Sequence, residues 1–158
     1  LRPWRLVQIG DAQRDALADV FEACTRDRLA AGVPPPEPTP ADITRAREKA
    51  YRAPTLLLAV LCLGADDPEV PATERTLTLG AALMNLLLAA HGQGFAAMLT
   101  SGHAVRSARF ARAFALAPQE QAVCFISIGT ALAKAKVRNP RASAHEVVSA
   151  WQPRPSAD

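Results

Sequence analysis

The plainest chemical signature in this sequence is a pair of closely spaced glycines. From Gly92 the chain reads Gly-Gln-Gly-Phe-Ala-Ala, which matches the G-x-G-x-x-A pattern of turns that hold a dinucleotide pyrophosphate. Such a turn follows a strand and opens a helix, so that the helix N-terminus faces the phosphate. Here the apolar pattern predicts the reverse order, with a helix before the glycines and a strand after them. We therefore expect Gly92 and Gly94 to end a helix, because glycine readily adopts the left-handed conformation found there.

Other side chains offer little for covalent or metal-assisted catalysis. Ser101 lies in Thr-Ser-Gly and lacks the glycine that precedes the nucleophile of a strained strand-to-helix elbow, which argues against acyl transfer. The histidines, His91, His103 and His145, have no metal-ligand spacing. The three cysteines include no Cys-x-x-Cys pair, so they predict neither a zinc site nor a disulfide framework, and they favour a reducing compartment.

Length and composition predict one globular domain over residues 1–158, with a proline-rich excursion at 32–40. Hydrophobic residues make up 49% and charged residues 21%, which is ordinary for a soluble protein. With 5% aromatic residues and a net charge of +3, nothing favours nucleic acid as a partner. The longest apolar run, Leu79–Ala90, is too short to span a bilayer. We expect a cytoplasmic protein with no membrane contact.

Strands and helices alternate along the chain, which predicts an α/β or α+β fold around a central sheet. Asp11 and Thr39 are candidate N-caps, and Pro40 would occupy the first position of its helix. Strands are predicted at Trp4–Ile9, Thr55–Leu63, Phe95–Leu99 and Ala122–Ile128, and helices at Asp11–Ala30, from Pro40 to about Arg52, at Glu74–His91, Ala104–Phe114 and Ser143–Trp151.

The predicted helix at Glu74–His91 has almost no polar face in its second half. A helix that is apolar all round must be buried all round, and one sheet covers only one of its sides. A second copy of the chain, in a two-fold homodimer, is the simplest cover for the other side. A central core helix in a monomer remains the alternative.

Four segments, in this order, resemble motifs of the FMN-dependent nitroreductase family, in its small single-domain branch. They are LRPWRLVQIG, YRAPTLLLAVLC, GAALMNLLLAAHGQGFAAMLTSG and ISIGTALAKAKVRNPRASAHEVVSAW. The resemblance implies a three-layer α+β sandwich with a mainly antiparallel sheet, and a homodimer with FMN at the subunit interface. It also implies that NADH or NADPH gives a hydride to flavin N5, and that an electron-poor nitroaromatic or quinone then accepts the electrons.

The same resemblance assigns roles to particular residues, although it assigns the chemistry itself to the flavin. Leu99, Thr100 and Ser101 match the segment that contacts the flavin ring, whereas the alternative is an ordinary turn with Ser101 capping the next helix. Lys136 and Arg138 match cations that hold the FMN phosphate, or they belong to a solvated basic tail. Arg2 stands where the family has a partner for the flavin pyrimidine. Nicotinamide contacts are implied for Ala89, Ala90, His91, Gly92, Gln93 and Gly94.

The sequence departs from the family at its front. Family members begin with a helix and an Arg-Arg-Ser type cluster that grips the FMN phosphate, whereas this sequence starts directly with the first strand. We therefore expect either a preceding segment outside these 158 residues or weaker FMN binding. Weaker binding would favour the alternative function, a non-catalytic homodimer of the same fold that binds a flavin or another anion. The acceptor, and the choice between NADH and NADPH, stay open.

Overall fold

Four antiparallel strands form the centre of the structure. The computed structural model describes residues 2–31, 37–64, 69–131 and 142–151. The strands lie in the order β1-β2-β4-β3, and each neighbouring pair is antiparallel. Their bounds are Trp4–Ile9 for β1, Thr55–Cys62 for β2, Ala96–Thr100 for β3 and Glu120–Gly129 for β4. The predicted class, α+β with a mainly antiparallel sheet, is confirmed.

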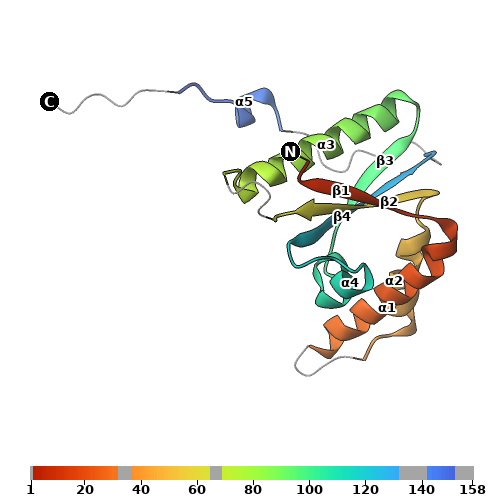
Figure 1. Ribbon diagram of the computed structural model, residues 1–158. Helices are drawn as coiled ribbons and strands as arrows, with labels where there is room; N and C mark the ends of the chain where they lie inside the picture. Colours follow the sequence, from red (N-terminus) through yellow and green to blue (C-terminus); the bar gives the residue numbers. More distant parts are fainter. Residues whose placement is uncertain (1, 32–36, 65–68, 132–141, 152–158) are drawn as a thin grey trace.

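Helices cover both faces of this sheet, so that the molecule has three layers (Figure 1). Helices α1 (Arg14–Ala30), α2 (Pro40–Arg47) and α4 (Ala108–Ala113) lie on one face, and the long α3 (Ala72–Gly92) lies on the other. Three short 3-10 helices are at Asp11–Gln13, Glu48–Tyr51 and Ala104–Arg106, and α5 is at Ala144–Val147.

Strand β2 is buried on both faces because its apolar side chains alternate between them, as the continuous run of apolar residues predicted. Leu56, Leu58 and Val60 pack into the core under α1, α2 and α4. Ala59 and Leu61 pack on the opposite side, under α3. One strand therefore joins the two cores of the molecule.

Phenylalanine rings fill the core under α1, α2 and α4. Phe110 is completely buried, and its ring centroid lies 4.5 Å from that of Phe114, 5.8 Å from that of Phe125 and 6.4 Å from that of Phe21. Aromatic pairs at such separations gain stability beyond the area they bury. The chain itself closes this side of the sheet.

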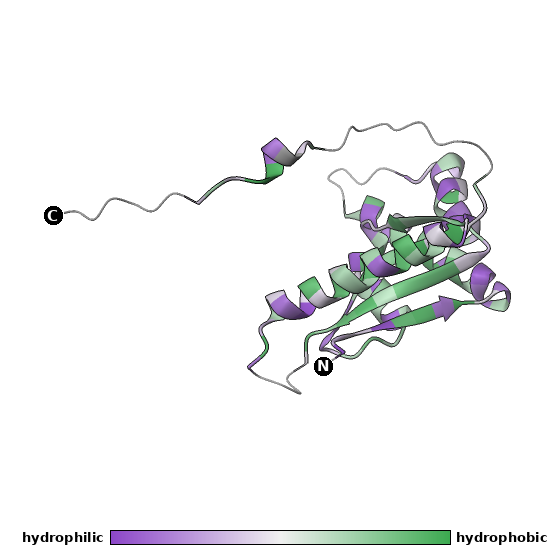
Figure 2. Cartoon of the chain, turned by 90° about the horizontal axis from the view of Figure 1, so that it is seen from above, coloured by the Kyte–Doolittle hydropathy of each residue, from purple (hydrophilic) through white to green (hydrophobic). Residues whose placement is uncertain are grey.

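The core under α3 is thinner, and the outer surface of that helix is apolar. Leu79 and Leu83 are buried against the sheet, whereas Leu77, Met84 and Leu88 are 68%, 52% and 55% exposed. The exposed three lie at helical positions i, i+7 and i+11, which places them on one face. Figure 2 shows hydrophobic residues along the length of α3, over the sheet.

The glycines that resemble a phosphate-binding turn do end α3. The amide of Gly94 donates to the carbonyl oxygen of His91 at 2.9 Å, and the amide of Phe95 donates to that of Ala90 at 3.0 Å. This pair of bonds is a Schellman motif, and Gly94 takes its left-handed position with φ +83°. The prediction of a helix terminus followed by a strand is confirmed.

The structure confirms the helix start predicted at Thr39 and corrects other predicted helix starts. Thr39 caps α2 as expected, in a reciprocal capping box with Asp42, and Pro40 is the first helical residue. Asp11 was wrongly assigned as a cap, since Gly10 holds that place without a side-chain bond and Asp11 already lies inside the first turn. Ser107 splits the helix predicted over 104–114, because its side chain accepts a hydrogen bond from the amide of Phe110 and caps α4. The last helix is shorter than predicted.

The described residues include neither a membrane-spanning helix nor a cluster of metal ligands. No helix there combines the length and the apolar character needed to cross a membrane. No group of three or more His, Cys, Asp or Glu side chains is placed there to hold a metal ion.

Candidate functional site

The end of β3 is the centre of the candidate site. Thr100 pairs with Phe125 of β4 and is the last residue of the strand. Ser101 and Gly102 follow as an irregular segment before the 3-10 helix at Ala104–Arg106. A Cβ added at Gly102 would meet nothing within 4 Å, so the backbone there is uncovered on that side. A flat ligand can approach the main chain at this point.

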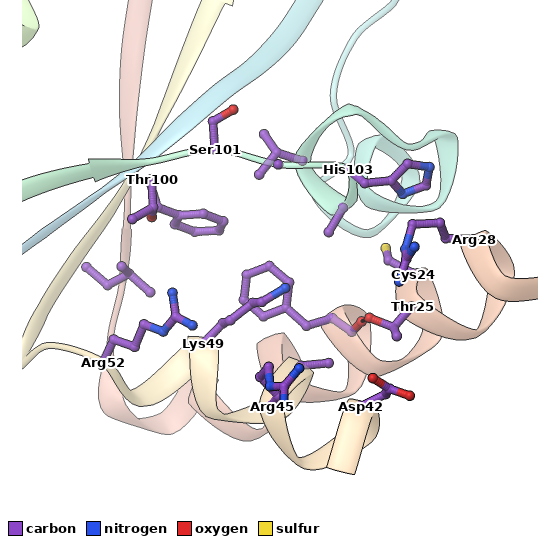
Figure 3. Close-up of a pocket in the computed structure, with 17 residues that line it drawn as sticks. Cys24, Thr25, Arg28, Asp42, Arg45, Lys49, Arg52, Thr100, Ser101 and His103 are labelled. Carbon is purple, nitrogen blue, oxygen red and sulfur yellow. Dashed lines mark hydrogen bonds between the residues drawn. The ribbon is translucent and has the colours of Figure 1, made fainter. Parts of the chain in front are cut away.

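A pocket of about 210 Å³ lies between this segment and helices α1 and α2 (Figure 3). Its floor is apolar, and most of its polar groups come from the helices. Figure 3 shows that Lys49 and Arg52 reach into the space between the helices and β3. The lining residues are Phe21, Cys24, Thr25, Arg28, Asp42, Arg45, Ala46, Lys49, Arg52, Leu56, Thr100, Ser101, Gly102, His103, Ala104, Val105 and Phe125.

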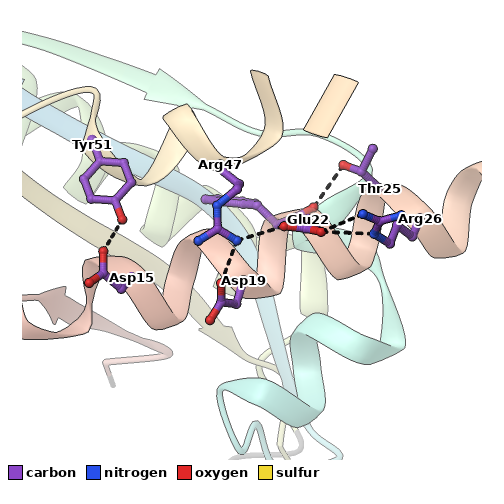
Figure 4. Close-up of polar contacts among 8 residues, drawn as sticks. Asp15, Asp19, Glu22, Thr25, Arg26, Arg47 and Tyr51 are labelled. Atoms are coloured by element: carbon purple, nitrogen blue, oxygen red, sulfur yellow. Dashed lines mark hydrogen bonds and ion pairs between the residues drawn. The ribbon is translucent and has the colours of Figure 1, made fainter. Parts of the chain in front are cut away.

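Four cations line this pocket and contact no carboxylate directly among the described residues. Arg28, Arg45, Lys49 and Arg52 make neither an ion pair nor a hydrogen bond within the part of the chain that the structure describes. The contrast is Arg47, which lies on the same helix as Arg45. Its guanidinium contacts the carboxylates of Asp19 and Glu22 on α1 at 2.6 and 2.8 Å (Figure 4), and so it ties α2 to α1.

Lys49 is the most enclosed of the four cations. Its ammonium group lies 5.9 Å from the centre of the Phe21 ring, a separation at which a cation is attracted to a ring face. Burial lowers the pKa of Lys49, and the nearby charges of Arg52 and Arg28 lower it further. A positive charge that is crowded by other positive charges is stabilised when an anion binds.

The acidic side chain at the pocket, Asp42, is already engaged. Its Oδ2 accepts hydrogen bonds from the amide of Thr39 at 3.1 Å and from the Thr39 hydroxyl at 2.7 Å. These hydrogen bonds are the main cause of the lowered pKa of Asp42, and Arg45 and Arg28 add a smaller effect through their charges. The carboxylate therefore serves the helix cap and leaves the pocket with an excess of positive charge.

The structure brings together some of the residues predicted for the site and separates others. Thr100 and Ser101 line the pocket, and Leu99 is 38% exposed on the same strand, although Figure 3 shows the Ser101 side chain pointing away from the helices. Arg2 precedes β1, at the opposite edge of the sheet, which is about 14 Å across three strand spacings. It is also displaced along the sheet, because the strand register places Thr100 level with Val7. Within one chain these residues do not meet.

The segment predicted to contact nicotinamide lies at the other end of β3. Ala89, Ala90, His91 and Gly92 form the last turn of α3, and Gln93 and Gly94 belong to its C-terminal cap. All of these residues except Ala90 are exposed. Lys136 and Arg138, predicted to hold a phosphate, lie outside the described residues.

Sequence reasoning missed the four pocket cations. Arg45, Lys49 and Arg52 are spaced i, i+4 and i+7, so a continuous helical turn would place them on one face, with Arg47 on another. The spacing was the available signal, but Arg28 joins the group only because α1 packs against α2.

Known proteins resemble this chain in sequence. The sequence pattern of the nitroreductase family matches residues 1–130. The chain is 30% identical over 135 residues to YdjA of Escherichia coli (strain K12), whose name describes an NAD(P)H nitroreductase. The match covers 85% of this chain and 69% of that protein.

Solved structures share the fold. A nitroreductase-like family protein from Bacillus cereus superimposes with a TM-score of 0.74 at 16% identity, over 95% of this chain and 74% of that one. A structure from Desulfovibrio desulfuricans, described as a nitroreductase in complex with FMN, gives a TM-score of 0.63 at 22% identity, over 97% and 74% of the two chains. With a family pattern over most of its length, a relative at 30% identity and this sandwich of layers, the chain belongs to the nitroreductase family.

Proposed function

We propose that this chain is an NAD(P)H-dependent flavin oxidoreductase, in which FMN passes electrons to a small electron-poor acceptor such as a nitroaromatic or a quinone. Family membership supports the proposal, as do the printed descriptions of YdjA as an NAD(P)H nitroreductase and of the Desulfovibrio protein as an FMN complex. The observation that carries it is the uncovered end of β3 beside a pocket with unpaired positive charge.

The residues at this end of β3 fit a flavin ring. The backbone of Leu99, Thr100 and Ser101 would hold the ring edge, because the main chain is open at Gly102. FMN supplies the redox chemistry when it is bound. The positive field of Lys49 and its neighbours would favour negative charge on a ligand at this place. Lys136 and Arg138 remain the proposed phosphate contacts.

The remaining assignments follow the resemblance. Ala89–Gly94 would contact the nicotinamide, and Arg2 would contact the flavin pyrimidine. Because Arg2 lies at the far edge of the sheet from Thr100, an Arg2 contact with the same ring would have to come from a second copy of the chain. This requirement supports a site that two subunits share.

We also propose that the chain is a homodimer that pairs through α3. Leu77, Ala81, Met84 and Leu88 form an exposed stripe along this helix. The stripe adjoins β3, where Met98 is 54% exposed, and Phe95, directly before the strand, is 46% exposed. Contiguous exposed apolar surface of this kind is typical of an interface, and a two-fold axis through the stripe would cover it on both copies.

The test of the catalytic proposal is optical. Purified protein is mixed with excess FMN, desalted, and then given NADH or NADPH under nitrogen. We expect a flavin spectrum that survives desalting and bleaches with one or both nucleotides. Retained colour without bleaching would favour the alternative function, a non-catalytic flavin-binding module. Loss of all colour on desalting would contradict both readings.

A further inference from the structure

The pocket beside β3 has an excess of positive charge that no contact within the described chain explains. Four cations face it and only one carboxylate, Asp42, lies among its lining residues. That carboxylate accepts hydrogen bonds from Thr39, and its single negative charge offsets only one of the four positive charges. Some arginines elsewhere in the described chain, such as Arg47 and Arg109, are paired with carboxylates, whereas the exposed Arg112 has no such ion pair, so the pocket cations are distinguished by their clustering. Charges held close together without partners are destabilising, and such an arrangement is typical of a place that an anion occupies.

The size of the pocket limits the anion. Sites for drug-sized ligands usually enclose about 300–1,000 Å³, and this pocket has about 210 Å³. A pocket of this volume cannot enclose a dinucleotide or a whole FMN, whereas it can enclose one six-membered ring with one acidic group. The pocket therefore suits a small ligand, or one end of a ligand that continues toward β3.

The floor of the pocket shows what the rest of that ligand must be. The apolar residues Phe21, Leu56, Val105 and Phe125 line the pocket, and each is no more than 6% exposed. Phe125 pairs with Thr100 across the strands, so this apolar surface extends directly to the end of β3. A flat aromatic ring gains from contact with such a surface, while a bare phosphate ion gains nothing from it.

We propose that this pocket recognises the carboxylate of a small aromatic acceptor, whose ring lies on the apolar floor and whose opposite end points to Thr100 and Ser101. Arg45, Lys49 and Arg52 bind the carboxylate, and the acceptor class is thereby narrowed to monocyclic aromatic acids. The identity of this ligand as an acceptor rests on the proposed function. The binding of an aromatic carboxylate to the pocket does not.

Binding is tested with benzoate, which carries no reducible group, against neutral benzamide and inorganic phosphate. Ligand-observed NMR on the full chain gives each dissociation constant. We expect benzoate to bind at least about tenfold more tightly than either comparison ligand. Benzamide lacks the charge-assisted contact and phosphate lacks the ring contact, and each missing contact should weaken binding by at least about tenfold. Affinity for benzoate should fall as salt screens the exposed part of the pocket.

Two charge-removing variants locate the site. Lys49→Gln and Arg52→Gln should each weaken benzoate binding roughly tenfold and leave benzamide binding unchanged. Arg52 is exposed and lies outside the core, so its variant tests the pocket even if the half-buried Lys49 is needed for folding. Arg112→Gln is the matched control, because Arg112 is an exposed arginine on α4 that does not line the pocket. It removes the same charge and should leave benzoate binding unchanged.

The remaining outcomes overturn the proposal. Equal affinity for benzoate and benzamide would mean that the pocket does not recognise the charge. Equal affinity for benzoate and phosphate would mean that the pocket does not recognise the ring. An equal loss of benzoate affinity in Arg112→Gln would mean that only the net charge of the protein matters and not the position of the cation. We expect benzoate to bind equally well when FMN is present, and competition by FMN would instead assign the pocket to the cofactor. A further outcome is that benzoate binds as expected while the protein retains no FMN and shows no flavin bleaching with NAD(P)H. That result would support the binding proposal for the pocket and contradict the catalytic proposal.

Discussion

The two faces of the sheet are covered in different ways. Under α1, α2 and α4, phenylalanines close the core from within, and ion pairs such as Arg47 with Asp19 and Glu22 fasten the helices to one another. On the other face, α3 is the one helix that the described residues place against the sheet, and it leaves an apolar stripe exposed. One face is therefore stabilised by the chain itself, whereas the other carries the surface through which we propose that two copies pair.

Phe110 provides the largest test of the self-contained face. Its replacement by alanine should cost about 3–5 kcal/mol of unfolding free energy, because a fully buried ring with three ring neighbours leaves a cavity. Denaturant unfolding measures the loss. The control is Leu77→Ala on the exposed stripe, which should cost about 0.5 kcal/mol or less in the unassociated chain. Similar losses for the two variants would contradict the contrast between the faces.

Leu88 tests whether the second face needs a partner. Leu88→Glu should raise the dissociation constant of the homodimer at least about 30-fold, as a charge buried at the centre of an interface costs about 2 kcal/mol or more. Sedimentation velocity over a range of concentrations reports the shift. Thr44→Glu adds the same charge on α2, across the sheet, and should leave self-association unchanged. A wild-type chain that is monomeric throughout would remove the argument.

The end of α3 offers a smaller effect. Gly94 has φ +83°, so Gly94→Ala should cost about 1–2 kcal/mol of unfolding free energy. Gly92 lies inside the last helical turn, where alanine is the better residue, so Gly92→Ala should be neutral or slightly stabilising. The thermal unfolding temperature should therefore fall for Gly94→Ala and stay unchanged or rise slightly for Gly92→Ala. Equal destabilisation would mean that packing, and not the C-cap, requires the glycines.

The smallest effect is expected for an ion pair at the rim of the self-contained face. Arg5 Nε and Nη2 donate to the two carboxylate oxygens of Glu120 at 2.6 and 2.9 Å. Since the Arg5 side chain is 41% exposed, a double-mutant cycle with Arg5→Met and Glu120→Gln should give a coupling of about 0.5–1 kcal/mol.

The same pair has a predictable pH dependence. Hydrogen bonds from Arg5 are the main cause that lowers the pKa of Glu120 to about 2. Because this folded-state pKa lies below the ordinary value of 4.5, the stabilisation is complete above that value. It is lost as the pH falls toward 2. The Glu120→Gln variant should lack this component of the acid dependence, and an unchanged acid profile would contradict the pKa assignment.

Much of the fold could be predicted because the signals are local. The strand at Trp4–Ile9 has the bounds that its apolar run indicated, and Thr39 caps its helix through bonds to a residue three positions away. Asp11 and the helix over 104–114 were harder to predict, since Gly10 holds the first cap position without a side-chain bond, whereas Ser107 caps α4 through a bond from the amide of Phe110. Local interactions reduce the number of candidate cap residues but do not select one of them.

The candidate site was predictable only in part. Thr100 and Ser101 were identified from the order of the motifs, and the structure places them at a pocket. The partners of that pocket could not be found in the same way. Arg45 and Arg47 are two residues apart and chemically identical, yet one pairs with α1 and the other faces the pocket. Their roles depend on where α1 lies, which is a long-range property of the fold.

The sequence by itself determined the elements, their order and the apolar excess of α3, because periodicity and capping act over a few residues. Tertiary structure alone decided that cations from α1, α2 and the following turn converge beside β3. It also decided that the carboxylate near them is occupied by a helix cap. The physical reason is that electrostatic fields add in space and not along the chain, so only the packed helices define where the positive charge is concentrated.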